Sequence, residues 1–213
     1  MRIGLDLDNT LACYDATFAA LAACEPDLPL GLPRTKLELR NHLRRIGREP
    51  RWTELQGDAY GPGMRLARPF PGALEFICKA RMAGHSVMII SQRTLRPLAG
   101  EPHDLHASAR QWIAEHLRDA TGALFDADAV FLERDRDAKV ARIGACACDV
   151  FVDDLPEVLE HPRFPPATLR VLFTPKQLRA APPFAPAADH TNGLRAPLRT
   201  LSGWDHFAPW SGQ

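Results

Sequence analysis

The sequence predicts an α/β fold: a doubly wound, Rossmann-like parallel sheet with a small helical cap inserted after the first strand. From residue 72 to 173, short apolar runs alternate with helical patterns, which is typical of such a sheet. Between residues 15 and 68, nothing resembles a buried strand. We therefore expect a core of residues 1–12 and 69–179, a helical cap of residues 13–68, and an irregular segment, 180–213, that packs on the core through scattered aromatic residues and is partly disordered at 185–192.

The predicted elements follow the apolar pattern. Ile3 and Leu5 form the first strand, which runs directly into Asp6-Leu7-Asp8-Asn9-Thr10. In the insertion, helices are expected from Tyr14 to about residue 22, over 36–46 and over 52–60. Beyond it we expect helices over 72–83, 105–117 and 136–147 and from 155 onward, and strands over 87–90, 129–132, 150–152 and 169–173.

Composition narrows the class of protein. Of 213 residues, 46% are apolar and 24% charged, as in ordinary globular domains, and 26 basic residues balance 26 acidic ones. We therefore expect neither a nucleic-acid polymer nor a membrane as partner, and no apolar run approaches the roughly 20 residues of a membrane span. Five cysteines and no signal peptide indicate a reduced, cytoplasmic protein. Cys146 and Cys148 lack the second ligand pair of a zinc site.

Polar side chains stand where the predicted strands end. In a parallel sheet these points share one edge, where ligands bind. Carboxylates suit a hard cation such as Mg²⁺, and an ammonium with a hydroxyl suits a phosphate. The group comprises four carboxylates, one hydroxyl and one ammonium: Asp6, Asp8, Asp153, Asp154, Ser91 and Lys139.

Over residues 2–11 and 70–173 the chain resembles the haloacid dehalogenase superfamily of phosphohydrolases. The resemblance lies in four ordered motifs: Asp6-Leu7-Asp8-Asn9-Thr10, Ile89-Ile90-Ser91, Lys139, and Val152-Asp153-Asp154. It implies that Asp6 is the nucleophile, forming an aspartyl-phosphate, and that Asp8 is the general acid and base. It also implies that Ser91 and Lys139 hold the phosphoryl group.

By the same resemblance, Mg²⁺ would be bound by the Asp6 side chain, the Asp8 backbone carbonyl and the Asp153/Asp154 pair. Asp154 is favoured as the direct ligand. Thr10 matches the phosphatase form of the first motif and is expected near the substrate. The implied activity is Mg²⁺-dependent hydrolysis of a small phosphorylated metabolite, either a nucleotide, including deoxyribonucleotides, or a sugar phosphate. A non-catalytic binding or regulatory domain of the same fold is the alternative.

Several further side chains have two readings. Arg93 either binds a substrate anion or is a surface arginine, and His103 and His106 either line the pocket or are solvated. Glu157 either supports the metal from a distance or is a solvated helix-face residue. Five arginines of the insertion either form a solvated helix face or recognise a second anionic group of the substrate: Arg40, Arg44, Arg45, Arg48 and Arg51. Trp52 and Tyr60 either form the small core of the insertion or stack on a base or sugar.

Overall fold

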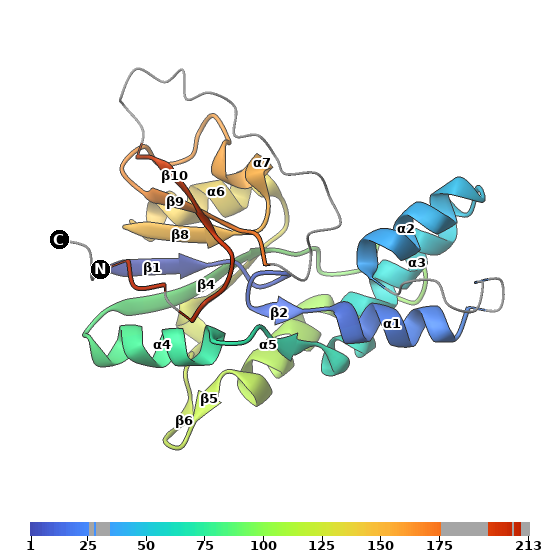
Figure 1. Cartoon of the computed structure of the whole chain (residues 1–213), viewed down its shortest axis with the longest axis horizontal. Helices are drawn as coiled ribbons and strands as arrows, with labels where there is room; N and C mark the ends of the chain where they lie inside the picture. The colour runs from blue at the N-terminus through green and yellow to red at the C-terminus, as the bar shows by residue number, and fades with distance from the viewer. Residues whose placement is uncertain (26–27, 29–34, 176–195, 206, 210–213) are drawn as a thin grey trace.

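The computed structural model describes residues 1–25, 28, 35–175, 196–205 and 207–209. Within these residues the main sheet has the strand order β10-β9-β8-β1-β4-β7, and every neighbouring pair is parallel (Figure 1). The predicted α/β fold with a parallel sheet is therefore confirmed. The strands are β1 Arg2–Leu5, β4 Ser86–Gln92, β7 Val130–Glu133, β8 Val150–Asp153, β9 Leu169–Phe173 and β10 Leu198–Leu201.

Helices pack on both faces of this sheet. Alternate residues of the strands point to opposite sides: Val150 and Val152 of β8 join one hydrophobic cluster, and Phe151 joins the other. The first cluster includes buried residues of α4 and α5, and the second includes those of α6 and α7. The sheet is thus doubly wound, as its continuous apolar strands predicted. These helices are α4 Ala73–Met82, α5 Leu105–His116, α6 Arg136–Ala145 and α7 Pro156–Leu159.

Gly4 is the one small residue in the middle of β1, and the packing explains it. A Cβ atom at Gly4 would lie 2.6 Å from Cδ2 of Phe151 and 2.9 Å from Sγ of Cys148. Glycine therefore allows the Phe151 ring to cross β1 at close range.

The insertion after the first strand is helical, and a short strand pair joins its two ends. It contains α1 Asp15–Ala23, α2 Lys36–Arg45, α3 Glu49–Tyr60 and the 3-10 helix η1 Pro62–Leu66. β2, Ala12–Cys13, pairs antiparallel with β3, Arg68–Pro69, a pair that the sequence did not predict. The Phe18 and Trp52 rings stack with centroids 5.5 Å apart in the core of this part. Figure 1 shows the three α-helices beyond the C-terminal end of β1.

The expectation of irregular structure after residue 180 is wrong for β10, which adds an edge strand beside β9. Trp204 beyond it is buried: its ring packs 4.9 Å from that of Phe76 and 5.2 Å from that of Phe173, and its Nε1 donates to the Thr10 carbonyl at 3.1 Å. The expected disorder at 185–192 lies outside the described residues, as does Trp210.

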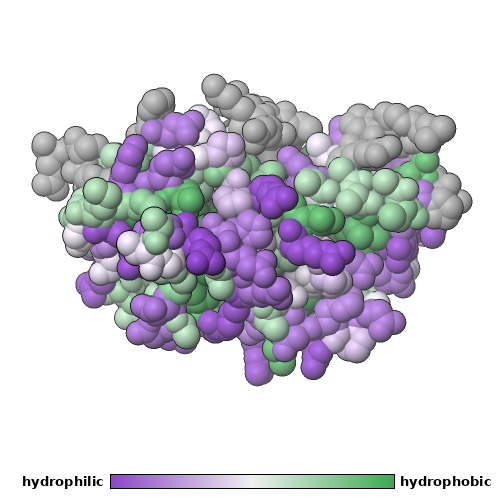
Figure 2. Space-filling view, turned by 90° about the horizontal axis from the view of Figure 1, so that it is seen from below, coloured by the Kyte–Doolittle hydropathy of each residue, from purple (hydrophilic) through white to green (hydrophobic). Residues whose placement is uncertain are grey.

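Two minor features complete the described fold. A hairpin of β5, Arg118–Asp119, and β6, Gly122–Ala123, follows α5, and the 3-10 helix η2, Ala127–Ala129, precedes β7. Hydrophilic residues cover most of the middle of the face shown in Figure 2, with hydrophobic residues in smaller groups. Among the described residues, no helix is both long and apolar enough to cross a membrane.

Candidate active site

The carboxyl edge of the sheet brings four predicted side chains into contact. Asp6 follows β1 and lies buried at the centre of the group. Ser91, near the end of β4, donates its hydroxyl to Asp6 Oδ1 at 3.0 Å. Lys139 Nζ donates to the same oxygen and forms an ion pair with Asp153 Oδ2, both at 2.6 Å. Positions separated by up to 133 residues thus meet at one carboxylate, as the ends of adjacent parallel strands require.

Local sequence explains how Lys139 reaches this point. Asp135 caps α6 by accepting the Ala138 backbone N–H at 2.8 Å, which fixes where the helix begins. Lys139 then lies one turn into the helix on its buried face. Burial opposes its charge, but the carboxylates of Asp153 and Asp6 outweigh this and hold the pKa of Lys139 above its ordinary value. The ammonium is therefore a permanent positive charge beside Asp6.

Carboxylates outnumber ammonium groups in this cluster. Oxygens of Asp6, Asp153 and Asp154 lie within 4.8 Å of one another, and Lys139 supplies a single compensating charge. Burial and the neighbouring Asp6 raise the pKa of Asp153 to about 7, against the pull of Lys139. Burial, Asp6 and Asp153 raise the pKa of Asp154 well above its ordinary value. This all-oxygen set with excess negative charge fits a hard divalent cation such as Mg²⁺.

Asp153 and Asp154 face different surroundings. Asp153 is fully buried, and its Oδ1 accepts the Leu155 backbone N–H at 3.0 Å. Asp154 is partly exposed and lines the cavity described below. Asp154 is thus the more accessible of the two for a cation entering from the cavity.

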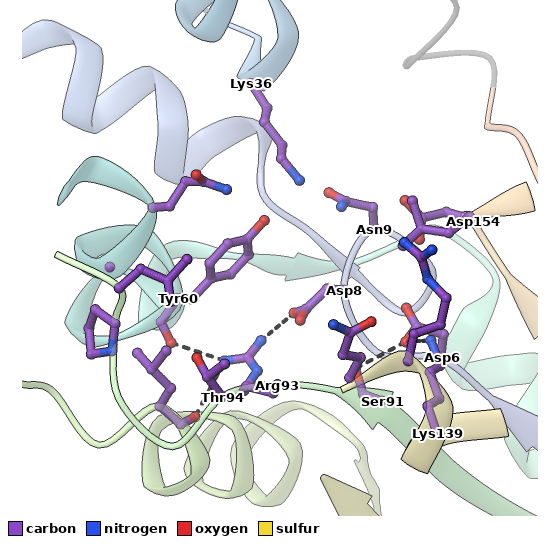
Figure 3. A pocket seen from close by; sticks show the side chains of 18 of the residues that line it. Asp6, Asp8, Asn9, Lys36, Tyr60, Ser91, Arg93, Thr94, Lys139 and Asp154 are labelled. Carbon is purple, nitrogen blue, oxygen red and sulfur yellow. Dashed lines mark hydrogen bonds and ion pairs between the residues drawn. The ribbon is translucent and has the colours of Figure 1, made fainter. Parts of the chain in front are cut away.

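Asp8 is held by two side chains that the motifs did not indicate as its partners. The Tyr14 hydroxyl donates to Asp8 Oδ1 at 2.6 Å. Arg93 Nη2 forms an ion pair with the same oxygen, and Figure 3 shows this contact. The Arg93 side chain is only 2% exposed and also donates to the Tyr60 carbonyl at 3.0 Å. Burial opposes the charge of Arg93, but Asp8 and Tyr14 outweigh it and raise its pKa. Arg93 is therefore not the surface arginine that one reading expected, and Asp8 balances the charge that the other reading assigned to a substrate anion.

A tight turn over residues 7–12 fixes the orientation of Asp8. Asn9 has φ of 59°, in the left-handed region that asparagine tolerates better than most residues. The backbone N–H groups of Leu11 and Ala12 both donate to the Leu7 carbonyl, at 3.0 and 2.8 Å. Thr10, expected near the substrate, is instead fully buried behind this turn, and its hydroxyl has no hydrogen-bond partner among the described residues.

A cavity of about 400 Å³ opens over these groups. Six of the eight predicted site residues line it, and Thr10 and Asp153 do not; the six are Asp6, Asp8, Ser91, Arg93, Lys139 and Asp154. Helix α3 forms one wall next to the loop at residues 97–99. Gly57 permits this contact, since a Cβ there would lie 2.8 Å from Pro97 Cβ and 3.1 Å from the Ala99 carbonyl oxygen.

Other cavity residues were missed by the sequence analysis. Lys36 at the start of α2, Gln56 on α3 and Arg136 at the start of α6 all line it. No motif marks them, since single polar residues on amphipathic helices look like any solvated face. Tyr60, one of the two aromatic residues considered, also lines the cavity, whereas Trp52 is buried against Phe18.

None of the five arginines considered in the sequence analysis lines this cavity. Arg44 pairs with Glu49 at 2.5 Å, and Arg51 pairs with Glu25 at 2.5 Å. Arg45 contacts the His42 ring at 3.0 Å. The interpretation of a mainly structural, surface role therefore fits these arginines better than the recognition of a second anion.

The two histidines after the second motif also lie outside the cavity lining. His103 is 3.5 Å from Asp58, and Nε2 of His106 lies 2.8 Å from the Arg93 carbonyl oxygen. Glu157 is exposed on α7 and does not line the cavity. The His106 contact places it behind Arg93.

Comparison with solved structures places this fold. A haloacid dehalogenase family hydrolase from Deinococcus radiodurans, solved with bound phosphate and sodium, matches with a TM-score of 0.50 at 14% identity, covering 95% of this chain and 91% of its own. CbbY from Rhodobacter sphaeroides, in complex with phosphate, matches with a TM-score of 0.48 at 17% identity, covering 96% and 95%. No family model and no curated protein sequence matches the chain. The chain has the haloacid dehalogenase-like fold, and the first of these structures supports that assignment.

Proposed function

We propose that the protein is a Mg²⁺-dependent phosphatase that hydrolyses a small phosphomonoester through an aspartyl-phosphate on Asp6. One observation carries the proposal: the Ser91 hydroxyl and the Lys139 ammonium converge on Asp6 at a cavity, beside two further carboxylates. A carboxylate needs neighbouring positive charge and hydrogen-bond donors before it can approach an anionic phosphate. This edge of the sheet supplies both.

The residues divide the reaction into two displacements. A carboxylate oxygen of Asp6 attacks phosphorus, the bond from phosphorus to the alcohol oxygen breaks, and Asp8 gives that oxygen its proton. Water then attacks phosphorus as Asp8 takes its proton, the bond to Asp6 breaks, and phosphate leaves. Ser91 and Lys139 hold the phosphoryl oxygens in both steps, and Arg93 with Tyr14 fixes the direction of the Asp8 carboxylate.

We assign the metal to the carboxylate cluster. Asp6 and Asp154 would bind Mg²⁺ directly, together with the Asp8 backbone carbonyl. Asp153 would support this site indirectly, through its ion pair with Lys139 and its hydrogen bond from the Leu155 N–H. When bound, the cation would offset the charge of the phosphoryl group and of the carboxylates. In this proposal helices α1–α3 act as a cap, and Thr10 supports the turn rather than contacting substrate.

Hydrolysis of p-nitrophenyl phosphate tests the proposal. Turnover should require Mg²⁺, stop with EDTA, and fall at least about 10³-fold in Asp6→Asn, because loss of the nucleophile removes the covalent path. Circular dichroism of the variant checks that it is folded. Phosphate binding without turnover on any phosphate ester would instead identify a non-catalytic binding domain. Turnover that survives in Asp6→Asn would contradict the mechanism. A screen that includes deoxyribonucleotides and sugar phosphates would then identify the substrate.

A further inference from the structure

Lys36 brings a second ammonium group into the cavity, on the side of the helical insertion, in addition to Lys139 and the guanidinium groups of Arg93 and Arg136. It is the first residue of α2, and its side chain reaches down into the cavity beside Tyr60 and toward Asn9 (Figure 3). Lys139, by contrast, projects from α6 and contacts Asp6. The cavity thus has one ammonium where the phosphoryl group is proposed to bind and another on the opposite wall.

The start of α2 holds the Lys36 backbone in place. The Thr35 hydroxyl accepts the Glu38 backbone N–H at 3.3 Å, and the Glu38 carboxylate accepts the Thr35 backbone N–H at 3.2 Å. This reciprocal capping box fixes the first turn of the helix. Lys36 therefore projects from a defined backbone position rather than from a loose loop.

The Lys36 ammonium is half-buried without a carboxylate ion-pair partner among the described residues. It contacts Tyr60, whose ring centroid lies 5.5 Å from Nζ and whose hydroxyl accepts a hydrogen bond from it. Burial opposes the charge, but Tyr60, Asp154 and Asp8 outweigh it and keep the pKa of Lys36 above its ordinary value. A desolvated cation that faces a cavity gains most from an anion that enters the cavity.

We propose that Lys36 binds a carboxylate on the alcohol part of the substrate, so that the enzyme acts on phosphorylated hydroxy acids. This inference rests on the proposed phosphatase function and names its substrate class. The neutral polar residues beside Lys36 on the α3 wall, Thr53 and Gln56, are suited to hydroxyl groups of such a molecule.

The charge balance favours a carboxylate over a second phosphate. Lys36 offers one positive charge, and its cavity neighbours on α3 are uncharged. A phosphate carries between about 1.5 and 2 negative charges at neutral pH and would leave part of its charge unmatched there. A carboxylate carries one, which a single ammonium balances.

The experiment compares 3-phosphoglycerate with glycerol 3-phosphate, which differ by a carboxylate in place of a hydroxymethyl group. In the wild type, the ratio of their kcat/KM values should favour the acid by about 10- to 100-fold, as expected for a hydrogen bond to a charged group. Lys36→Met should reduce this ratio to near one, and Lys36→Arg should keep most of it. Arg45→Gln, which removes a positive charge from the same helix outside the cavity, should leave the ratio as it is.

A second pair separates carboxylate from phosphate: 1,3-propanediol bisphosphate against 3-hydroxypropyl phosphate. A larger preference for the bisphosphate than for the carboxylate would overturn the single-charge assignment. The role of Lys36 would be overturned if the wild type showed no preference for 3-phosphoglycerate, or if the preference survived in Lys36→Met.

Calorimetric binding of the same four compounds to Asp6→Asn, with and without Lys36→Met, gives the comparison independently of turnover. If no phosphate ester is hydrolysed, the proposed function fails, and these dissociation constants still decide whether Lys36 binds the carboxylate. Equal affinity for the acid and its uncharged partner compound would refute it. Tighter binding of the acid that depends on Lys36 would support it.

Discussion

The carboxylate cluster makes the stability of the metal-free protein depend on pH. Asp153 has a pKa of about 7 in the folded protein, against an ordinary value of 3.8. Between these two pH values the folded chain therefore keeps a proton on Asp153 that the unfolded chain has released. The stabilisation that comes from protonated Asp153 is therefore fully present below about pH 3.8 and is lost as the pH rises through 7. Metal-free protein should thus be more stable at pH 5 than at pH 7.

The linkage relation gives the magnitude. For one carboxyl with these two pKa values, the free energy of unfolding should fall by about 2 kcal/mol between pH 5 and pH 7. Asp154, whose pKa is also raised, adds to the fall in the same direction.

Urea unfolding in EDTA at pH 5 and pH 7 measures this effect, with Asp153→Asn as the matched variant. The amide has nearly the same shape and does not titrate, so the fall should be about 2 kcal/mol smaller in the variant. Added Mg²⁺ should stabilise the wild type at pH 7 through binding to the folded state. An equal fall in both proteins would refute the assignment of the raised pKa to Asp153.

Three substitutions test other contacts. Arg93→Met should lower the free energy of unfolding by about 3 kcal/mol, because it leaves Asp8 without its cation; a loss below 1 kcal/mol in urea unfolding would contradict this ion pair. Trp204→Ala should cost about 3–5 kcal/mol by thermal or urea unfolding, and an unchanged midpoint would mean that the C-terminal packing is not formed. Gly4→Ala should cost about 1–3 kcal/mol, since its Cβ meets Phe151; a neutral result would show that this ring can move.

The parallel sheet could be predicted because strands buried on both faces are continuous apolar runs. Val150 and its neighbours in β8 show this plainly. β2 and β3 are two residues each, too short for any period to appear. β10 was missed because an edge strand needs little apolar surface, and its sequence Leu198–Leu201 is half polar.

The candidate site divides in the same way. The sequence could bring Asp6, Ser91, Lys139 and Asp153 together. The three other than Lys139 lie at the C-terminal end of a strand or directly after it, Lys139 lies in the first turns of the helix that follows β7, and the strands belong to one parallel sheet. The Arg93 contact with Asp8 depends on side-chain direction, which spacing does not encode. Lys36 depends on how the helical insertion lies over the sheet edge, and a lone lysine on an amphipathic helix carries no local signal.

A covalent phosphoryl group on Asp6 is the central claim, and rapid quenching tests it most directly. The protein is mixed with Mg²⁺ and p-nitrophenyl phosphate, quenched in acid during the first turnover, and digested for peptide mass spectrometry. The account predicts a phosphorylated peptide containing Asp6 that appears before free phosphate and is absent from Asp6→Asn. Turnover with no phosphorylated peptide, or with the phosphoryl group on another residue, would contradict it.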